Sequence, residues 1–269
     1  MQIFLFVFVI IIKNKFSMGC YIKNNSDCSF LVDDNDLIGR TILSTGSWES
    51  NIEEVFKNIV KSDYTTVNIG ANMGYHTIKL GMISQKVIAF EPQRKMFNQL
   101  CSNIYLNSLD DKIDAYRLAL GDVKEKARMA SFENNPFLVC GELSNFGGMS
   151  IPEDGTGEEI QIVTLDSLNI SPDFILMDAE GYEHKILLGS SETLRESNPI
   201  ILFECWSTQT DKMFHYLKSL GYGIYWRPDF VDNFIALHEE FRDYEGVKGK
   251  LKELNFCEFY FSYDKSNIE

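Results

Sequence analysis

Short apolar runs alternate with amphipathic segments along most of this 269-residue chain, and the alternation restricts the fold more than any other feature. The apolar runs have the length of buried strands, at residues 65–69, 87–90, 113–118, 174–177 and 200–203. Helical periodicity follows four of them, which predicts an α/β fold with a doubly wound, mostly parallel sheet. Three later runs, at 222–227, 234–237 and 257–263, are expected to form an antiparallel C-terminal edge.

The segment after the first predicted strand reads Asn-Ile-Gly-Ala-Asn-Met-Gly-Tyr and begins at Asn68. Ligands of such sheets lie beyond the carboxyl ends of the strands, and glycine there lets backbone N–H groups approach a ligand. A dinucleotide fingerprint would need glycine where this chain has Asn72 and Tyr75, and no P-loop Gly-Lys-Ser/Thr follows. The loop therefore favours a ligand such as S-adenosylmethionine, which brings no pyrophosphate to it, over NAD.

Glu91 closes the second predicted strand, 21 residues after Gly70. An acid at this distance accepts hydrogen bonds from both ribose hydroxyls in nucleoside-binding α/β folds. A glycine turn and a distant acid also occur in ordinary strand–helix turns with a solvated glutamate. These two features alone leave both interpretations open.

Six blocks of sequence resemble, in order, the FkbM family of S-adenosylmethionine-dependent methyltransferases. They are Val67-Asn-Ile-Gly-Ala-Asn-Met-Gly-Tyr-His-Thr, Val87-Ile-Ala-Phe-Glu-Pro, Leu118-Ala-Leu-Gly-Asp, Val163-Thr-Leu-Asp-Ser-Leu, Phe174-Ile-Leu-Met-Asp-Ala-Glu-Gly-Tyr-Glu and Pro199-Ile-Ile-Leu-Phe-Glu. Six ordered blocks at compatible spacing are more specific than any one of them. The resemblance runs from about residue 46 to residue 237 and leaves both ends of the chain uncovered.

The resemblance implies a Rossmann-like class I methyltransferase fold, S-adenosylmethionine as the donor, and a hydroxyl of a sugar, glycan or small molecule as the acceptor. It implies cofactor contacts at Asn68, Gly70, Ala71, Asn72, Gly74, Glu91 and Leu120. One departure is Asn68, where family members usually carry Asp. An amide can still accept a hydrogen bond through its oxygen, but it lacks the charge that would attract the methionine amino group.

The chemistry is expected at Asp178 and Glu180, which follow the fourth strand of the predicted parallel sheet. Methyl transfer to oxygen needs an aligned acceptor and a base that takes its proton. Neighbouring carboxylates raise one another's pKa, which favours a base, and Glu204 after the fifth strand is a further acid of this group. They could instead hold a divalent cation, but we favour the base and assign no metal ligand. His184 is expected to face solvent on the following helix.

Two other functions remain compatible with the pattern: an NAD-binding protein, disfavoured by Asn72, and a non-catalytic module that keeps the fold, for which Asn68 is the one argument. Nucleic acid is an unexpected partner. The chain has 25 Lys and Arg against 39 Asp and Glu, a formal net charge of −14, and a phosphate backbone is bound chiefly through Lys and Arg.

The chain is expected to divide into an N-terminal extension, residues 1–35, and a methyltransferase domain, residues 36–269. The extension contains the unbroken apolar run 3–12, which is too short to cross a bilayer as a helix. The run is interpreted as a buried strand or a translation artefact, with an interfacial membrane anchor as the alternative. Six scattered cysteines without a C-x-x-C pair are typical of reduced thiols and predict a cytoplasmic protein.

Overall fold

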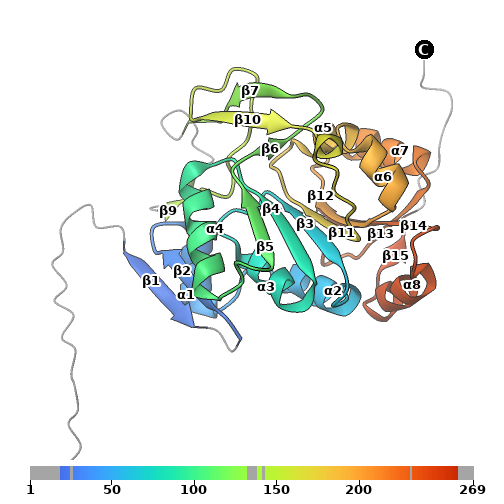
Figure 1. Cartoon of the computed structure of the whole chain (residues 1–269), viewed down its shortest axis with the longest axis horizontal. Coiled ribbons are helices and arrows are strands. Elements are labelled where there is room, and N and C mark those ends of the chain that lie inside the picture. The colour runs from blue at the N-terminus through green and yellow to red at the C-terminus, as the bar shows by residue number, and fades with distance from the viewer. Residues whose placement is uncertain (1–18, 25–26, 132–137, 141–142, 231, 260–269) are drawn as a thin grey trace, which may run out of the picture.

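A computed structural model describes residues 19–24, 27–131, 138–140, 143–230 and 232–259. Its centre is an eight-stranded sheet with the order β15-β13-β14-β12-β11-β3-β4-β5 (Figure 1). The strands are β3 (Thr65–Ile69), β4 (Lys86–Phe90), β5 (Ile113–Tyr116), β11 (Phe174–Met177), β12 (Ile200–Glu204), β13 (Tyr222–Trp226), β14 (Asn233–His238) and β15 (Cys257–Glu258).

Five neighbouring strands of the sheet are parallel, and the three strands at one edge are antiparallel. β5, β4, β3, β11 and β12 pair in parallel, whereas β14 pairs antiparallel with β12, β13 with β14, and β15 with β13. The chain builds outward from β3 through β4 to β5, then returns to place β11 on the other side of β3. This confirms the predicted doubly wound sheet with its antiparallel C-terminal edge, and β3 and β11 flank the switch point.

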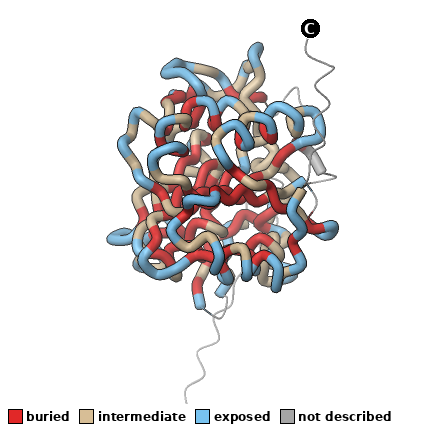
Figure 2. The backbone as a smooth tube through the Cα atoms, turned by 90° about the vertical axis from the view of Figure 1, so that its right-hand side faces the viewer, coloured by how far each residue is buried: buried red, intermediate tan, exposed pale blue. Residues whose placement is uncertain are grey.

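Helices cover both faces of the sheet because neighbouring strand residues point to opposite sides. In β11, Phe174 and Leu176 belong to one core cluster, whereas Ile175 and Met177 belong to the other. The first cluster includes side chains of α1 (Leu37–Thr45), α2 (Ser50–Ile59), α3 (Tyr75–Ile83), α4 (Arg94–Leu106) and α8 (Tyr244–Glu253). The second includes side chains of α5 (Glu183–Leu188), α6 (Ser191–Ser197) and α7 (Thr210–Ser219). Figure 2 shows the resulting buried band through the middle of the molecule.

The predicted third strand, 113–118, is split in the structure. β5 ends at Tyr116, and the chain then enters a small second sheet with the order β6-β10-β7 (top of Figure 1). Its strands are β6 (Ala119–Leu120), β7 (Glu125–Arg128) and β10 (Glu159–Val163), and the 3-10 helix η3 (Leu165–Leu168) follows. The predicted strand was too long. β5 lies at the edge of the main sheet and has one neighbouring strand, and the apolar residues after Tyr116 pack elsewhere instead of extending it.

The N-terminal segment contains a hairpin of β1 (Cys20–Asn24) and β2 (Ser29–Asp33), which periodicity did not reveal. β2 packs on α4: Phe30 and Val32 are fully buried in the first core cluster, and the side chain of Asn103 accepts from the backbone N–H of Leu31 at 2.6 Å. The described part of the predicted 1–35 extension thus shares the core of the domain that follows it.

The apolar run 3–12 lies outside the described residues, so its interpretation stays a prediction. No helix within the described part of the chain combines the length and the apolar character needed to cross a membrane. The described cysteines with free thiols are Cys20, Cys28, Cys101, Cys205 and Cys257.

The segment between β7 and β10 contains the short pair β8 (Val139–Cys140) and β9 (Leu143–Ser144). Asp36 ties this segment to the start of α1. One carboxylate oxygen accepts from the N–H of Gly39, as an N-cap, and the other accepts from the N–H of Phe146. Because Asp36 is only 3% exposed, this tie is part of the packed structure.

We expect Phe30→Ala to lower the free energy of unfolding by about 3–5 kcal/mol, because it empties a fully buried site of the core. The matched variant is Tyr21→Ala in the paired strand β1, where the side chain is 49% exposed and the loss should be about 1 kcal/mol or less. Chemical denaturation measures both. A loss for Phe30→Ala as small as the loss for Tyr21→Ala would show that the hairpin is not a structural part of the domain.

Candidate active site

The carboxyl ends of β3, β4, β11 and β12 surround a cavity of about 280 Å³. Eight of the nine predicted site residues line it, and Gly74 does not. The eight are Asn68, Gly70, Ala71, Asn72, Glu91, Leu120, Asp178 and Glu180. Side chains separated by more than 100 residues in the sequence therefore face one space.

Gly70 makes the closest backbone approach in this region. It has a φ of +78°, and a Cβ built on it would lie 1.7 Å from the carbonyl oxygen of Asp178. The N–H groups of Gly70 and Ala71 both donate to the carbonyl of Phe90, at 3.0 and 2.9 Å. The loop after β3 is thus held against the ends of β11 and β4 at once, and only glycine satisfies both the conformation and the space.

Glu91 joins the loop after β3 to the loop after β4. One carboxylate oxygen accepts from the N–H of Asn72 and the other from the N–H of Gln93, each at 2.8 Å. Burial raises the pKa of Glu91 to about 7, while these two hydrogen bonds oppose the shift. Each oxygen has a second lone pair, so the carboxylate can also accept from ribose hydroxyls in the cavity that it lines.

Asn68 and Gly74 support the loop in different ways. The side-chain amide of Asn68 donates to the hydroxyl of Thr77 at 2.8 Å, which links the end of β3 to α3. Gly74 precedes α3 with a φ of +94°, and a Cβ there would meet the side chain of Leu100 at 2.6 Å. Gly74 therefore allows α3 and α4 to pack closely.

Four acidic side chains gather at the ends of β11 and β12: Asp178, Glu180, Glu183 and Glu204. Asp178 is exposed toward the cavity but enclosed by protein, and burial together with the charge of Glu204 raises its pKa well above the ordinary value. Burial and the same neighbour raise the pKa of Glu180 to about 8. Both carboxyl groups therefore bind a proton more tightly than an ordinary carboxyl group does.

Glu183 is the member of this group to which the sequence analysis assigned no role. It is 1% exposed, and one of its oxygens accepts from the N–H groups of Ala179 and Gly181, at 2.8 and 3.3 Å. Burial raises its pKa as well. Its signal in the sequence was an acid in the first turn after the glycine of Asp178-Ala-Glu-Gly-Tyr-Glu, but burial of that helix face depends on the packing of α5.

Two histidines near the site, His184 and His76, differ in their surroundings. His184 on α5 is half-buried and is not among the residues lining the cavity, and burial lowers its pKa. His76 lines the cavity, and its Nε2 lies 2.9 Å from a carboxylate oxygen of Glu49. Glu49, which lines the cavity too, has a φ of +43° as the residue before α2. Trp48 next to it is another lining residue.

The segment 145–151 forms a further wall of the cavity, which none of the sequence motifs indicated. Phe146 is fixed from two directions: its N–H donates to Asp36, and its carbonyl accepts from the side chain of Gln93 at 3.1 Å. The lining residues from this segment are Asn145, Phe146, Gly147, Met149 and Ile151. Parts of the chain before and after β3 thus meet over the same space.

The sheet order and a cavity at the carboxyl ends of β3 and β4 define the Rossmann-like class I methyltransferase fold. The Methyltransferase FkbM domain matches residues 68–224, more than half of the chain. This chain belongs to the FkbM family of S-adenosylmethionine-dependent methyltransferases, as its sequence blocks predicted. No curated protein sequence matches it.

One solved structure supports the fold. The chain is similar to the methyltransferase FkbM from Methylobacillus flagellatus KT, with a TM-score of 0.50, 19% identity and coverage of 66% of this chain and 44% of that one. It thus spans less than half the length of that protein. Two more distant similarities are the M. jannaschii TYW2 in complex with AdoMet (TM-score 0.43, 15% identity, 83% and 86% covered) and the M. jannaschii tRNA m1G37 methyltransferase (0.46, 14%, 81% and 55%).

A pair of glycine variants tests the contact between β3 and β11. Gly70→Ala should destabilise the protein by the cost of a left-handed residue, about 1–2 kcal/mol, plus ~1–3 kcal/mol or more for overlap with Asp178. Gly46→Ala is the control, because Gly46 also has a positive φ, of +84°, but a Cβ there would meet nothing within 4 Å. Denaturant unfolding compares them. Equal losses would contradict the close backbone approach at Gly70.

Proposed function

We propose that this protein transfers the methyl group of S-adenosylmethionine to a hydroxyl of a small-molecule, sugar or glycan acceptor. The observation that carries the proposal is the position of Asp178 and Glu180, two carboxylates of raised pKa, in the same cavity as Glu91 and the Gly70 loop. This supports a nucleoside site and a proton acceptor that would lie side by side.

The cofactor would lie along the carboxyl ends of β3 and β4. Glu91 would accept from the ribose hydroxyls, and the backbone from Gly70 to Asn72 would pass close to the methionine portion. Leu118 and Leu120 follow β5, the strand next to β4, and would provide an apolar wall for the adenine beyond Glu91. Asn68 lacks the charge usual at its position, and Glu49 is a cavity-lining acid that would offset this loss near the amino group.

Transfer to oxygen explains the acidic end of the cavity. The acceptor oxygen attacks the methyl carbon in line with the carbon–sulfur bond, that bond breaks, and the hydroxyl proton passes to a carboxylate. A carboxylate whose pKa is raised toward 8 takes that proton more readily than an ordinary one. A neutral amine acceptor would not need a base during the attack, so these groups favour a hydroxyl.

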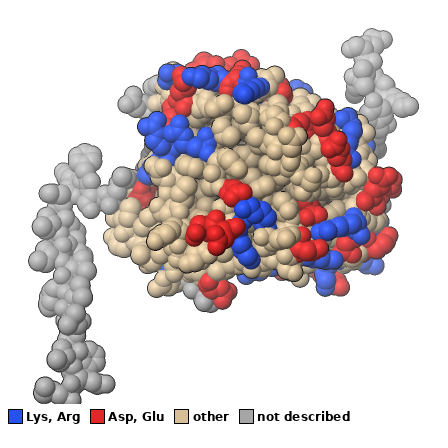
Figure 3. Space-filling model, in the orientation of Figure 1, with Lys and Arg blue, Asp and Glu red and all other residues tan. Residues whose placement is uncertain are grey.

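A polar, uncharged acceptor fits this charge pattern better than a nucleic acid with its negatively charged phosphates. Carboxylates line the place where the acceptor would enter, and they accept hydrogen bonds from hydroxyl groups. In Figure 3, Lys and Arg side chains are interspersed with Asp and Glu on the face shown. With the formal net charge of −14, this disfavours a nucleic acid.

The first test is binding of S-adenosylhomocysteine, measured by calorimetry. Glu91→Ala should weaken it tenfold or more, because a hydrogen bond to a charged group contributes about 1.5–3 kcal/mol. The control is Glu158→Ala, which removes an acid that acts on Glu91 electrostatically but does not line the cavity, and its affinity should be unchanged. Thermal melting of both variants reports on the fold. Unchanged affinity in the folded Glu91→Ala protein would refute the cofactor position.

The second test is turnover, followed as release of S-adenosylhomocysteine with a panel of sugar and small-molecule hydroxyl acceptors. Asp178→Asn keeps the shape of the side chain and should lower the rate by about 10²–10⁴-fold while the cofactor still binds. His184→Ala should have little effect because His184 lies outside the cavity lining. Binding of the cofactor without turnover on any acceptor would favour a non-catalytic module.

A further inference from the structure

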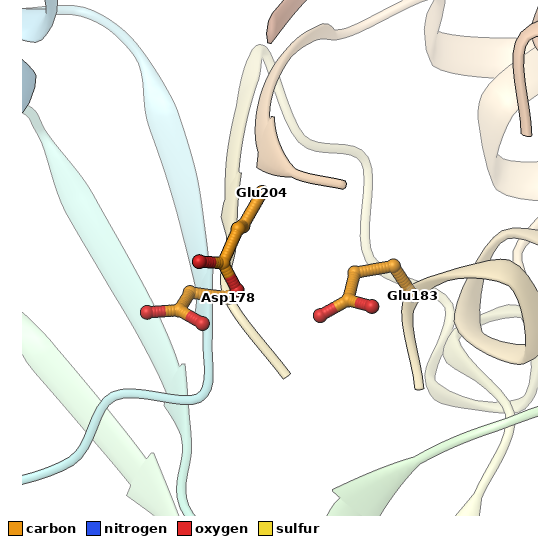
Figure 4. A group of neighbouring side chains, drawn as sticks. All are labelled: Asp178, Glu183 and Glu204. Carbon is orange, nitrogen blue, oxygen red and sulfur yellow. The ribbon is translucent and has the colours of Figure 1, made fainter. Parts of the chain in front are cut away.

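Three carboxyl groups at the end of the sheet face one another closely enough to hold one ion. Asp178 comes from the end of β11, Glu204 from the end of β12, and Glu183 from the first turn of α5 (Figure 4). One oxygen of each lies within 4.8 Å of the oxygens of the other two. Two oxygens bound to one Ca²⁺ can be separated by at most about 4.6–5.2 Å, twice the bond length, and for Mg²⁺ the limit is about 4.2 Å.

The second oxygen of Glu183 points to a ligand independently of this grouping. Glu183 is 1% exposed, and its Oε2 is buried with no hydrogen-bond partner among the described residues. The other oxygen is fixed by the N–H groups of Ala179 and Gly181, so the carboxylate cannot rotate to relieve Oε2. Figure 4 shows this carboxylate directed toward Asp178 and Glu204. An unpaired buried carboxylate oxygen is costly, and a cation at this position would remove the cost.

The surroundings of the three carboxylates are also acidic. Asp178 and Glu204 line the same cavity as Glu180 and Glu49, and no Lys or Arg is among the described residues that line it. A divalent ion would neutralise part of this negative charge.

We infer that Asp178, Glu183 and Glu204 form a binding site for one hard divalent cation, with Ca²⁺ fitting the unrelaxed spacing and Mg²⁺ or Mn²⁺ requiring a small contraction. All three donors are carboxylate oxygens, the ligand type that these ions prefer. Cation binding does not depend on methyl transfer.

A consequence for catalysis follows, and it rests on the proposed function. An ion at this site would bind the acceptor hydroxyl oxygen and lower its pKa, and Glu180, which is not one of the three ligands, would take the proton. The oxygen–methyl bond forms, the carbon–sulfur bond breaks, and S-adenosylhomocysteine leaves. The two predicted catalytic carboxylates would then have separate roles.

The test uses the full chain, freed of metal by a chelator, in the absence of S-adenosylmethionine. Trp206 donates to Glu204 at 3.1 Å, so it is placed to sensitise the luminescence of Tb³⁺, a hard ion that substitutes for Ca²⁺. We expect saturable emission at one equivalent of Tb³⁺, competed by Ca²⁺, and a higher melting temperature in Ca²⁺. Trp206→Phe should reduce the emission but leave the calorimetric affinity for Tb³⁺.

Isosteric variants decide whether the three carboxylates form the site. Glu183→Gln and Glu204→Gln keep an acceptor for the groups that now donate to them, and each should weaken Tb³⁺ binding roughly tenfold or more and abolish the Ca²⁺ effect on melting. The matched control is Glu180→Gln, which removes a neighbouring charge outside the three and should bind much as the wild type. An equal loss in Glu180→Gln, or absence of saturable binding, would overturn the site. Neither result would affect the proposed methyl transfer, because no cofactor is present.

Discussion

The contact between the backbone of Gly70 and the carbonyl of Asp178 is the constraint on which the rest of the site depends. β3 and β11 are neighbours in the sheet, but the chain leaves them for opposite halves of the fold, so their ends must pass each other closely. A residue with a Cβ at position 70 would separate them. Because the N–H groups of Gly70 and Ala71 also donate to the carbonyl of Phe90, the same loop positions Glu91 and the carboxylates after β11, the residues proposed for the cofactor and for catalysis, relative to each other.

The acidic end of the cavity is a concentration of charge that stability alone would not select. Burial raises the pKa values of Asp178, Glu180, Glu183 and Glu204, and the charges of neighbouring carboxylates add to this for Asp178, Glu180 and Glu204, so these groups bind protons more tightly in the folded protein than in the unfolded chain. Three of the four stand at the ends of β11 and β12 or in the first turn of α5, and Glu180 lies in the turn between β11 and α5. Groups held in this way are suited to receive a proton or a cation during a reaction.

The walls of the cavity come from segments that lie far apart in the sequence. Asp36, at the start of α1, binds the N–H of Phe146, and Gln93 binds the carbonyl of the same residue. The hairpin of β1 and β2 in turn packs on α4, the helix that follows Gln93. The N-terminal part of the chain therefore supports the surface through which an acceptor would enter, whatever the role of the residues before it.

The sequence by itself determined the sheet, its family and the residues after each parallel strand, because these depend on local periodicity and on short motifs. Thr65–Ile69 and Phe174–Met177 were predicted at their exact bounds, since both are short segments buried on two sides of the sheet and bounded by polar or glycine-containing turns. Tertiary structure decided the hairpin before residue 35, the end of β5 at Tyr116 and the burial of Glu183. Each of these depends on contacts with residues distant in the chain: an edge strand, a hairpin face and one side of a short helix acquire their burial from what packs on them.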